Sequence, residues 1–374
     1  MAREDRLQKP TVQENSIFSS QEITDSAWDS FVCKNAGAHY AQSSGWAKIK
    51  NTIGWKQERI ILSEQGQTLA GAQLLFHSMP IFGNILYSIK GPLNASGNSK
   101  HDEEILELIL QEAHRNECRV SVIQPPANAA HLEHLLQNKG FQASRLVPEH
   151  SASLTLNLEK SLDQILAGMR RQTRQDIRRG EREGIQILEG KYEDLDTFYQ
   201  LYQVTGNRQG FVPYPWVYIN TMWQVFQPQN NLMVLLSQYR GQIVSAVLLI
   251  CFVDTVFGYL LGWSGLYKEF RPNNALIWGA IQWAQAHNYK KFDFGGINPE
   301  GAKAILAGKK LPDKIRNSPE FIKYGFGGEI ILSPPAYDYL PNPLFNLIYR
   351  ALMGTIGGYT PTSKLFRIIR KILI

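Results

Sequence analysis

Two separate stretches of the chain show the same order of hydrophobic and polar positions. Residues 57–76 read QERIILSEQGQTLAGAQLLF, which is a hydrophobic run, a polar turn at Gly66 and a second hydrophobic run. Residues 231–251 read NLMVLLSQYRGQIVSAVLLIC and repeat this order, with the turn at Gly241. Short apolar runs joined through a glycine-containing turn are typical of paired β-strands. The pattern therefore predicts one strand hairpin in each half of the chain.

The same order continues beyond the two hairpins. Each is followed by a further strand, ILYSIKGPL at 85–93 and TVFGYLLGW at 255–263. A helix is then expected at 103–116 in the first copy and at 274–287 in the second. Each copy closes on a short strand, CRVSVIQPP or KKFDFGGIN. Repetition of the whole order at a spacing of about 170–175 residues indicates a tandem duplication.

The duplication predicts an α/β (α+β) protein of two similar lobes, each a mixed sheet flanked by helices. We expect a disordered arm at 1–20, a first lobe at 21–150, a second lobe at 151–345 and a basic amphipathic tail at 346–374. A length of 374 residues agrees with this division, because chains of this size usually form about two domains.

The longest apolar stretch runs from Ile243 to Trp263 and is almost long enough for a membrane span, which needs roughly 20 apolar residues. Asp254 and Thr255 interrupt it, however, and β-branched and aromatic residues dominate on both sides. We therefore expect two buried strands joined by a tight turn rather than a transmembrane helix.

The two ends of the chain differ in character. The first residues, MAREDRLQKPTVQENS, lack the apolar core of a signal peptide. The last residues, SKLFRIIRKILI, alternate apolar residues with Lys364, Arg367, Arg370 and Lys371 at helical spacing. This composition is typical of an amphipathic helix on an anionic membrane surface. A terminal helix docked on the core with its basic side in water remains the alternative.

Composition narrows the class of protein. The chain has 39 Lys and Arg against 33 Asp and Glu, a formal charge of +6, with 44% hydrophobic residues, so it is a folded globular protein with a mild preference for anionic partners. Three scattered cysteines exclude a disulfide framework and favour a reducing, cytoplasmic compartment. His131 and His134 lack a third ligand and are expected at the surface. We expect no metal and no cofactor.

The order of elements resembles the GNAT acyltransferase lobe. That fold usually holds acyl-CoA through a glycine-rich turn whose backbone N–H groups face the pyrophosphate at a helix N-terminus. Here the corresponding turn reads RPNNAL at 271–276, and the first lobe has NSKHDE. Neither carries the glycines, so the resemblance implies the fold while disfavouring an acyl-CoA donor.

Six motifs, in order, resemble the FemABX family of aminoacyltransferases, which build peptide cross-bridges of bacterial peptidoglycan. The resemblance extends from about Asp25 to about Tyr349. The motifs are HYAQSSGWAKIKNTIGW at 39–55, YSIKGPL at 87–93, the arginine-rich MRRQTRQDIRRGEREGIQI at 169–187, TGNRQGFVPYPWVYINTM at 205–222, KKFDFGGI at 290–297 and FIKYGFGGEI at 321–330.

The resemblance implies an aminoacyl-tRNA donor and an acceptor amine on the stem peptide of a precursor that carries a diphosphate. The reaction is the aminolysis of an ester, in which negative charge grows on the carbonyl oxygen. A fixed cation stabilises that charge. Lys323 matches the family lysine near the ester, so we expect it to be catalytic; the alternative is a surface lysine at the start of a strand.

The resemblance also implies a binding site for the precursor phosphates. Lys50 matches the phosphate-binding lysine, and Lys48 would replace it if the helix were rotated. Tyr218 matches a tyrosine that reaches the precursor. Some members carry an arginine four residues earlier, where this chain has Tyr214. Arg208 is the nearby residue expected to supply that charge, unless it is a solvated residue at a helix end.

Two further positions bear on the acceptor. Some members have another precursor-contacting tyrosine near Leu260, and only Tyr259 is close in this chain. Asp293, at the end of a predicted strand, either orients the acceptor amine or caps the following turn, and the capping role is preferred. No residue stands out as a general base.

The arginine-rich segment places Arg170, Arg174 and Arg178 four residues apart, on one face of a helix. Such a stripe can neutralise phosphates of tRNA or of anionic lipid. The alternative is a solvated face partly paired with Asp176 and neighbouring glutamates.

We therefore expect an enzyme that moves an amino acid from aminoacyl-tRNA to the stem peptide of a lipid-linked or nucleotide-linked peptidoglycan precursor. It would be cytoplasmic, with peripheral contact at the inner face of the plasma membrane. The alternatives are a GNAT-type N-acyltransferase that uses acyl-CoA and a non-catalytic membrane-surface scaffold of the same fold.

Overall fold

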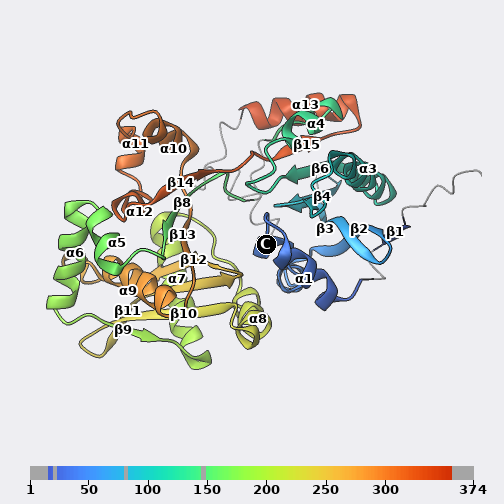
Figure 1. Cartoon of the computed structure of the whole chain (residues 1–374). Helices are drawn as coiled ribbons and strands as arrows, with labels where there is room; N and C mark the ends of the chain where they lie inside the picture. The colour runs from blue at the N-terminus through green and yellow to red at the C-terminus, as the bar shows by residue number, and fades with distance from the viewer. Residues whose placement is uncertain (1–15, 20–22, 80–82, 145–148, 356–374) are drawn as a thin grey trace, which may run out of the picture.

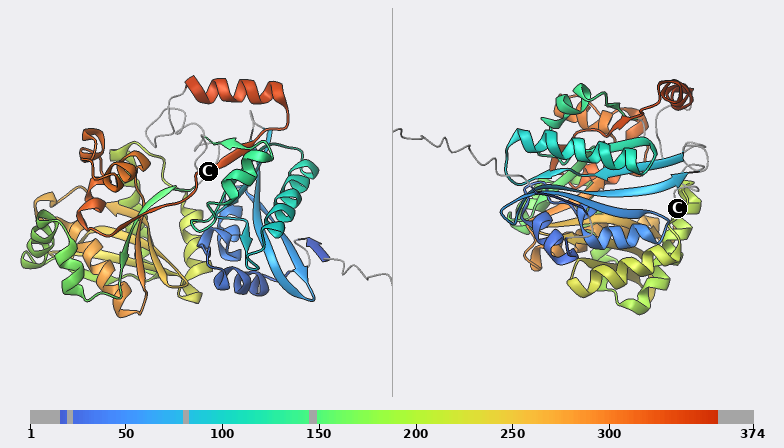
Figure 2. Two further views of the ribbon diagram at one scale, coloured as in Figure 1. Left: turned by 45° about the horizontal axis from the view of Figure 1, so that its top comes forward. Right: turned by 90° about the vertical axis from the view of Figure 1, so that its right-hand side faces the viewer.

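The computed structural model describes residues 16–19, 23–79, 83–144 and 149–355, and shows two α/β lobes side by side (Figure 1). Each lobe is built on one twisted sheet with helices on its faces, as two further views confirm (Figure 2).

The sheet of the first lobe has the strand order β1-β2-β3-β4-β6-β15-β7, with β5 beside β3. The strands are β1 (Ser16–Ser19), β2 (Lys56–Glu64), β3 (Gln67–Met79), β4 (Gly83–Ile89), β5 (Leu93–Asn94), β6 (Cys118–Gln124), β7 (Gln142–Ala143) and β15 (Tyr337–Tyr339). The helices are α1 (Asp25–Lys34), α2 (Ser44–Asn51), α3 (Ser99–Arg115) and α4 (Leu132–Asn138), with α13 (Pro343–Thr355) near the end of the described chain.

The sheet of the second lobe has the order β14-β8-β13-β12-β11-β10-β9. The strands are β8 (Ala152–Asn157), β9 (Gln186–Glu189), β10 (Leu232–Tyr239), β11 (Gln242–Phe252), β12 (Thr255–Trp263), β13 (Lys291–Gly296) and β14 (Glu329–Leu332). The helices are α5 (Leu162–Gly168), α6 (Arg171–Arg182), α7 (Leu195–Gln209), α8 (Trp216–Phe226), α9 (Pro272–Ala286), α10 (Pro299–Leu306), α11 (Asp313–Arg316) and α12 (Phe321–Gly325).

The predicted duplication is confirmed by the topology. The series β2-β3-β4-α3-β6 in the first lobe corresponds to β10-β11-β12-α9-β13 in the second. In both lobes the first three strands pair antiparallel, whereas β4 with β6 and β12 with β13 pair parallel. This difference is expected, because tight turns join antiparallel strands and a crossover helix joins parallel ones.

The apolar stretch from Ile243 to Trp263 forms most of β11 and all of β12, which pair antiparallel. The prediction of two strands joined by a tight turn is therefore confirmed, and β11 is buried as expected, whereas most of β12 is only half-buried because one end of this strand lines a cavity between the lobes. Among the described residues, no helix has the length and apolar character needed to cross a membrane.

Two of the predicted boundaries differ from the path of the chain. Ser16–Ser19, inside the expected disordered arm, form β1 and pair with β2; residues 1–15 lie outside the described chain. At the other end, Tyr337–Tyr339 leave the second lobe before residue 345 and pair with β6 of the first sheet. The buried Tyr337 ring packs in the first-lobe core, so side-chain burial explains this return. Residues 356–374, which hold most of the expected basic tail, also lie outside the described residues.

One hydrophobic core continues from the first lobe into the second. Trp46 on α2 and Tyr218 on α8 belong to the same buried cluster. The helices touch closely at Gly45, where a Cβ atom would lie 2.5 Å from a ring carbon of Phe226. This shared core fixes the two lobes against each other, so residues of both can form one site.

Candidate active site

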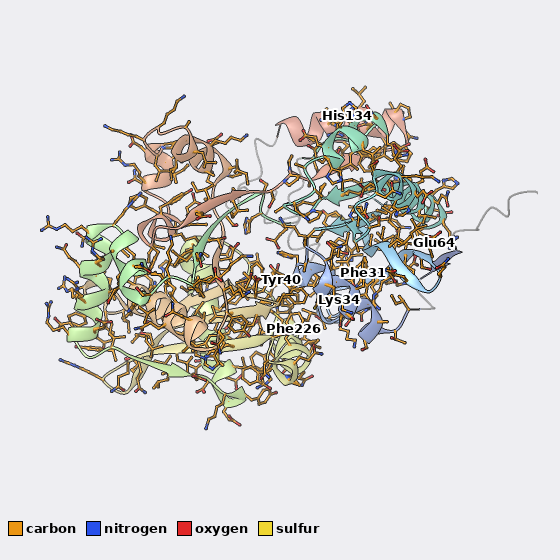
Figure 3. All side chains as sticks on the ribbon, viewed as in Figure 1. Phe31, Lys34, Tyr40, Glu64, His134 and Phe226 are labelled. Atoms are coloured by element: carbon orange, nitrogen blue, oxygen red, sulfur yellow. The ribbon has the colours of Figure 1, made fainter. Side chains whose placement is uncertain are left out.

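A cavity of about 1100 Å³ lies between the two lobes. Residues of α2 and of the turn after β4 line one side, and residues of β8, β12, β13 and α12 line the other. Figure 3 shows Tyr40, one of the lining residues, at the junction of the lobes. We call this cavity the interlobe cleft.

Lys323 lies in the interlobe cleft, as the family resemblance implies. It belongs to α12 rather than to the start of a strand, and its side chain is half-buried. The Nζ atom donates a hydrogen bond to the carbonyl oxygen of Gly296 at 2.7 Å. Desolvation lowers the pKa of Lys323, while the charges of Asp293 and Glu320 oppose this shift. The ammonium group is thus held at the cleft wall by one backbone contact.

Asp293, on β13, lines the same part of the cleft. Its carboxylate accepts hydrogen bonds from the Gly295 backbone N–H at 2.7 Å and from the Thr155 hydroxyl at 3.2 Å. Burial raises the pKa of Asp293, although these bonds and Lys323 favour the charged form. The contact with Gly295, whose φ is +72°, is the turn-capping contact preferred from the sequence.

Lys50, on α2, lines the cleft from the first lobe. Its Nζ atom lies 5.3 Å from the ring centre of Trp46 and 5.9 Å from those of Tyr214 and Tyr218. Lys48 points elsewhere and pairs with Asp25 at 2.7 Å. The rotation of α2 therefore places Lys50, and not Lys48, in the cleft.

Two tyrosines lie near this lysine, and a third contacts one of them. Tyr214 and Tyr218 stack with ring centres 4.2 Å apart and planes 11° apart. The Tyr218 and Tyr259 hydroxyls lie 2.9 Å apart and share a hydrogen bond. Tyr214 and Tyr259 line the cleft, whereas Tyr218 is fully buried behind them. Burial raises the pKa of Tyr218 well above its usual value, so its hydroxyl is neutral at physiological pH.

The structure does not bring Arg208 to the cleft. Arg208, near the end of α7, donates to the carbonyl oxygen of Trp263 at 3.2 Å and lies 4.4 Å from the centre of that ring. Trp263 ends β12, whereas the cleft is lined by the other half of that strand, Thr255–Leu260. Arg208 therefore does not replace the charge that Tyr214 lacks.

The arginine-rich segment forms α6 on the outside of the second lobe (Figure 1). Arg170, just before the helix, stacks on Phe321 at 4.7 Å and donates its backbone N–H to Gly325. Arg174 donates to the Ala167 carbonyl oxygen at 3.3 Å, and Arg178 is exposed. The segment does not line the cleft, but Arg170 contacts α12, the helix that carries Lys323.

Among the cleft residues that the sequence analysis gave no role are His39, Tyr40, Lys90, Glu149 and His150. Tyr40 donates to the Glu149 carboxylate at 3.2 Å, and Lys90 donates to the His150 carbonyl oxygen at 3.2 Å. Desolvation lowers the pKa of His39 to about 3. His39, Tyr40 and Lys90 lie within the first two motifs, which was a usable signal. Glu149 and His150 lie outside every motif, so no motif pointed to them. Only the fold brings these two residues to the cleft.

Comparison with known proteins gives two domain matches. Residues 23–143 match the FemAB family, and residues 167–303 match the acetyltransferase (GNAT) domain. A lipid II:glycine glycyltransferase of Staphylococcus saprophyticus is 23% identical over 352 residues, with 74% of this chain and 85% of that protein covered. The resemblance to the FemABX family is confirmed.

Other similarities of the FemABX-like chain agree with this. The lipid II:glycine glycyltransferase of Staphylococcus epidermidis is 26% identical over 201 residues, which cover 51% of this chain and 48% of that protein. The crystal structure of FemX superimposes with a TM-score of 0.74 at 18% identity, covering 89% of this chain and 99% of that one. A tandem GNAT protein from the clavulanic acid pathway reaches 0.52 at 8% identity over 88% of this chain and 99% of that one. The expected GNAT-like fold is therefore confirmed.

In this FemABX-like chain, α6 covers the start of α9. A Cβ atom on Gly180 of α6 would lie 3.0 Å from the Cβ of Ala275, in the first turn of α9. Asp176 of α6 also pairs with Arg271, the residue before α9, at 3.4 Å. The first turn of α9, the place where GNAT lobes usually hold acyl-CoA, is thus packed against α6 and lies beside the Asp176 carboxylate.

The described residues contain no group of three or more His, Cys, Asp or Glu side chains arranged to hold a metal ion. His131 instead contacts the Asp102 carboxylate at 3.0 Å.

Proposed function

We propose that the protein is an aminoacyltransferase that moves an amino acid from aminoacyl-tRNA to the stem peptide of a peptidoglycan precursor. The observation that carries this proposal is the interlobe cleft, because it places Lys323 of the second lobe and Lys50 of the first on one cavity. The likeness to lipid II:glycine glycyltransferases supports the class of reaction.

The chemistry requires little covalent participation by the protein. The acceptor amine attacks the carbonyl carbon of the aminoacyl ester, and negative charge develops on the carbonyl oxygen. The Lys323 ammonium, which already donates to the Gly296 carbonyl oxygen, keeps further N–H donors for that oxygen. A pre-positioned charge of this kind is worth about 3–4 kcal/mol in comparable sites.

Lys50 is proposed to bind the diphosphate end of the precursor. Because Tyr214 stands where some members carry arginine and Arg208 lies elsewhere, Lys50 provides the cationic contact at this wall of the cleft. Tyr214, which lines the cleft and stacks on the buried Tyr218, offers a flat surface for an apolar or sugar face of the ligand. The arginines of α6, adjacent to α12, are proposed to contact the tRNA backbone.

A membrane contact is proposed through the end of the chain. On α13, Leu344, Leu347 and Ile348 are 68%, 69% and 48% exposed and follow helical spacing. Residues 343–374 contain arginine and lysine but neither aspartate nor glutamate. Apolar side chains combined with positive charge favour the surface of an anionic bilayer. Such a contact at the inner face of the plasma membrane would suit a lipid-linked acceptor in the cytoplasm.

The donor is the point on which the proposed function and its main alternative differ. The protein is incubated with precursor and either a mixture of charged tRNAs or acetyl-CoA, and the precursor is analysed by mass spectrometry. We expect the mass of one or more amino acids to be added from charged tRNA alone, without added metal or cofactor. Acetyl transfer, or tight calorimetric binding of acetyl-CoA, would instead favour the acyl-CoA alternative.

A further inference from the structure

His150 occupies a distinctive position at the junction of the lobes. It belongs to the segment between β7 and β8, and its exposed side chain lines the interlobe cleft. A Cβ atom on Gly296 would lie 1.9 Å from Cγ and 2.0 Å from Nδ1 of His150. The imidazole therefore lies directly on the Gly296 backbone, whose carbonyl oxygen accepts the Lys323 hydrogen bond at 2.7 Å. One peptide group thus connects the imidazole and the ammonium.

Buried polar side chains fix the backbone on which His150 stands. The Gln124 side chain, which is fully buried, exchanges two hydrogen bonds with the backbone of Glu149, at 3.0 and 3.1 Å. The Glu149 carboxylate accepts the His150 backbone N–H at 3.0 Å, and the 6%-exposed Lys90 donates to the His150 carbonyl oxygen at 3.2 Å. These hydrogen bonds from buried polar groups fix the backbone positions of Glu149 and His150.

The imidazole itself remains available for chemistry. Among the described residues, none makes a hydrogen bond to either ring nitrogen of His150. Two carboxylates near it are already engaged: Asp293 accepts from Gly295 and Thr155, and Glu149 accepts from Tyr40 and the His150 backbone. Unlike these two carboxylates, the His150 imidazole has ring nitrogens that no described residue hydrogen-bonds, so it can accept a proton from a ligand in the cleft.

Desolvation, more than the charges around the ring, keeps the His150 imidazole neutral. Desolvation in the cleft, with Lys323 and Lys90 nearby, lowers the pKa of His150, and the carboxylates of Glu149 and Asp293 oppose this. The pKa of His150 therefore lies below its ordinary value of 6.5. At neutral pH the imidazole is thus unprotonated, the form that can accept a proton.

We propose that His150 is the general base of the aminoacyl transfer, an inference that rests on the proposed function. As the acceptor amine forms the new C–N bond, the imidazole takes one proton from the attacking nitrogen. The Lys323 ammonium stabilises the oxyanion of the tetrahedral intermediate. When the C–O bond to the tRNA ribose breaks, the imidazolium returns the proton to the departing oxygen, so protons and charge balance over the cycle.

The test compares His150→Ala and His150→Gln with the matched control His134→Ala, an exposed histidine on α4. Because general-base catalysis contributes about 10²–10⁴-fold, kcat should fall by that factor in both His150 variants, with KM for the precursor and Tm little changed. Added imidazole should restore part of the rate that His150→Ala loses. It should not raise the rate of the control His134→Ala. Rescue of this kind depends on a missing proton acceptor, so a purely structural role would not produce it.

The pH profile of kcat is a second measurement, and it remains informative even if the His150 variants have a lower Tm. In the wild type, kcat should decrease as pH falls through a value below 6.5, because the imidazole becomes protonated. His150→Gln should lose this acid limb. A variant with wild-type kcat and an unchanged limb would contradict His150 as the base while leaving the proposed function intact. Absence of transfer by the wild type, with a known glycyltransferase active in parallel, would overturn both.

Discussion

The two lysines of the interlobe cleft are held in different ways, and this predicts different kinetic roles. Lys323 is fixed by a backbone carbonyl oxygen, close to where a reacting ester would lie, whereas Lys50 stands over aromatic rings at the opposite wall. An interaction made only in the transition state changes kcat, while one made equally with bound substrate changes KM.

Lys323→Met should lower kcat about 10²–10³-fold, because the variant lacks the cation that faces the developing oxyanion. Lys309→Met, at an exposed lysine beyond α10, is the matched control and should keep wild-type kinetics. Thermal denaturation of both variants tests folding. Wild-type turnover by a folded Lys323→Met protein would exclude this role.

Activity should also fall at alkaline pH in a defined direction. The pKa of Lys323 is lowered by desolvation from its ordinary 10.5, so its ammonium is lost as pH rises through this lowered value. The protonated form is the active one, and the loss should therefore begin below the usual lysine range. A kcat profile that stays flat up to pH values near 10.5 would contradict this assignment.

Lys50→Met should raise KM for the precursor about tenfold with a smaller effect on kcat, because a phosphate contact persists through the reaction. Lys48→Met is the matched control on the same helix, since Lys48 pairs with Asp25 outside the cleft. Steady-state kinetics separate the two variants. If both substitutions raised KM equally, the charge of α2 in general would be responsible, and not the contact that Lys50 makes in the cleft.

At the scale of residues, the motifs identified the two cleft lysines but did not show which residues from elsewhere in the chain lie beside them. Lys50 and Lys323 lie in the cleft as their motifs implied, because each lysine sits on a helix, α2 or α12, that borders the cleft. Arg208 is close to Tyr214 in sequence, but α7 runs along β12 toward Trp263, away from the cleft. His150 could not be found, since its partners Gly296 and Lys323 are distant in sequence and only packing unites them.

At the scale of elements, α7 packs so closely against β12 that an extra side-chain atom at Gly262 would not fit. A Cβ atom on Gly262 of β12 would lie 2.7 Å from the backbone nitrogen of Tyr202 and 2.8 Å from the carbonyl carbon of Leu201, both on α7. Gly262→Ala should therefore destabilise the fold by about 1–3 kcal/mol. Gly168→Ala, where no atom lies within 4 Å, should be nearly neutral. Chemical denaturation measures both, and equal stabilities would contradict the packing argument.

The exposed face of α13 predicts a membrane-binding phenotype. Replacing Leu344, Leu347 and Ile348 together by glutamate should weaken sedimentation with phosphatidylglycerol vesicles at least several-fold, because both apolar contact and charge attraction are lost. The control replaces the exposed Val204 and Val217 by glutamate, which changes charge at apolar sites of α7 and α8. Unchanged vesicle binding by the α13 variant would contradict the proposed contact.

The elements themselves were largely readable from the sequence. The hairpins β2–β3 and β10–β11 follow the hydrophobic pattern closely, because one strand–turn–strand unit carries its own signal. The short strand β15 carries no such signal. Its Tyr337 and Asp338 pair with Ile123 and Val122 of the first sheet, a contact made across more than half of the chain.

The whole molecule explains why the two lobes act together. A core shared by α2 and α8 joins them, and β15 returns the chain from the second lobe to the first sheet. In the second lobe, α6 covers the start of α9, where a GNAT lobe would receive acyl-CoA. The cleft between the lobes is therefore the cavity in which we propose that the transfer takes place.

The central claim is that this cleft transfers an amino acid from charged tRNA to a peptidoglycan precursor. The most direct measurement is mass spectrometry of lipid-linked and nucleotide-linked precursors after incubation with charged tRNAs and the wild type, Lys323→Met or Lys309→Met. The account predicts amino-acid addition by the wild type and Lys309→Met, and almost none by Lys323→Met. No addition by the wild type to either precursor, while a known glycyltransferase succeeds under the same conditions, would contradict it.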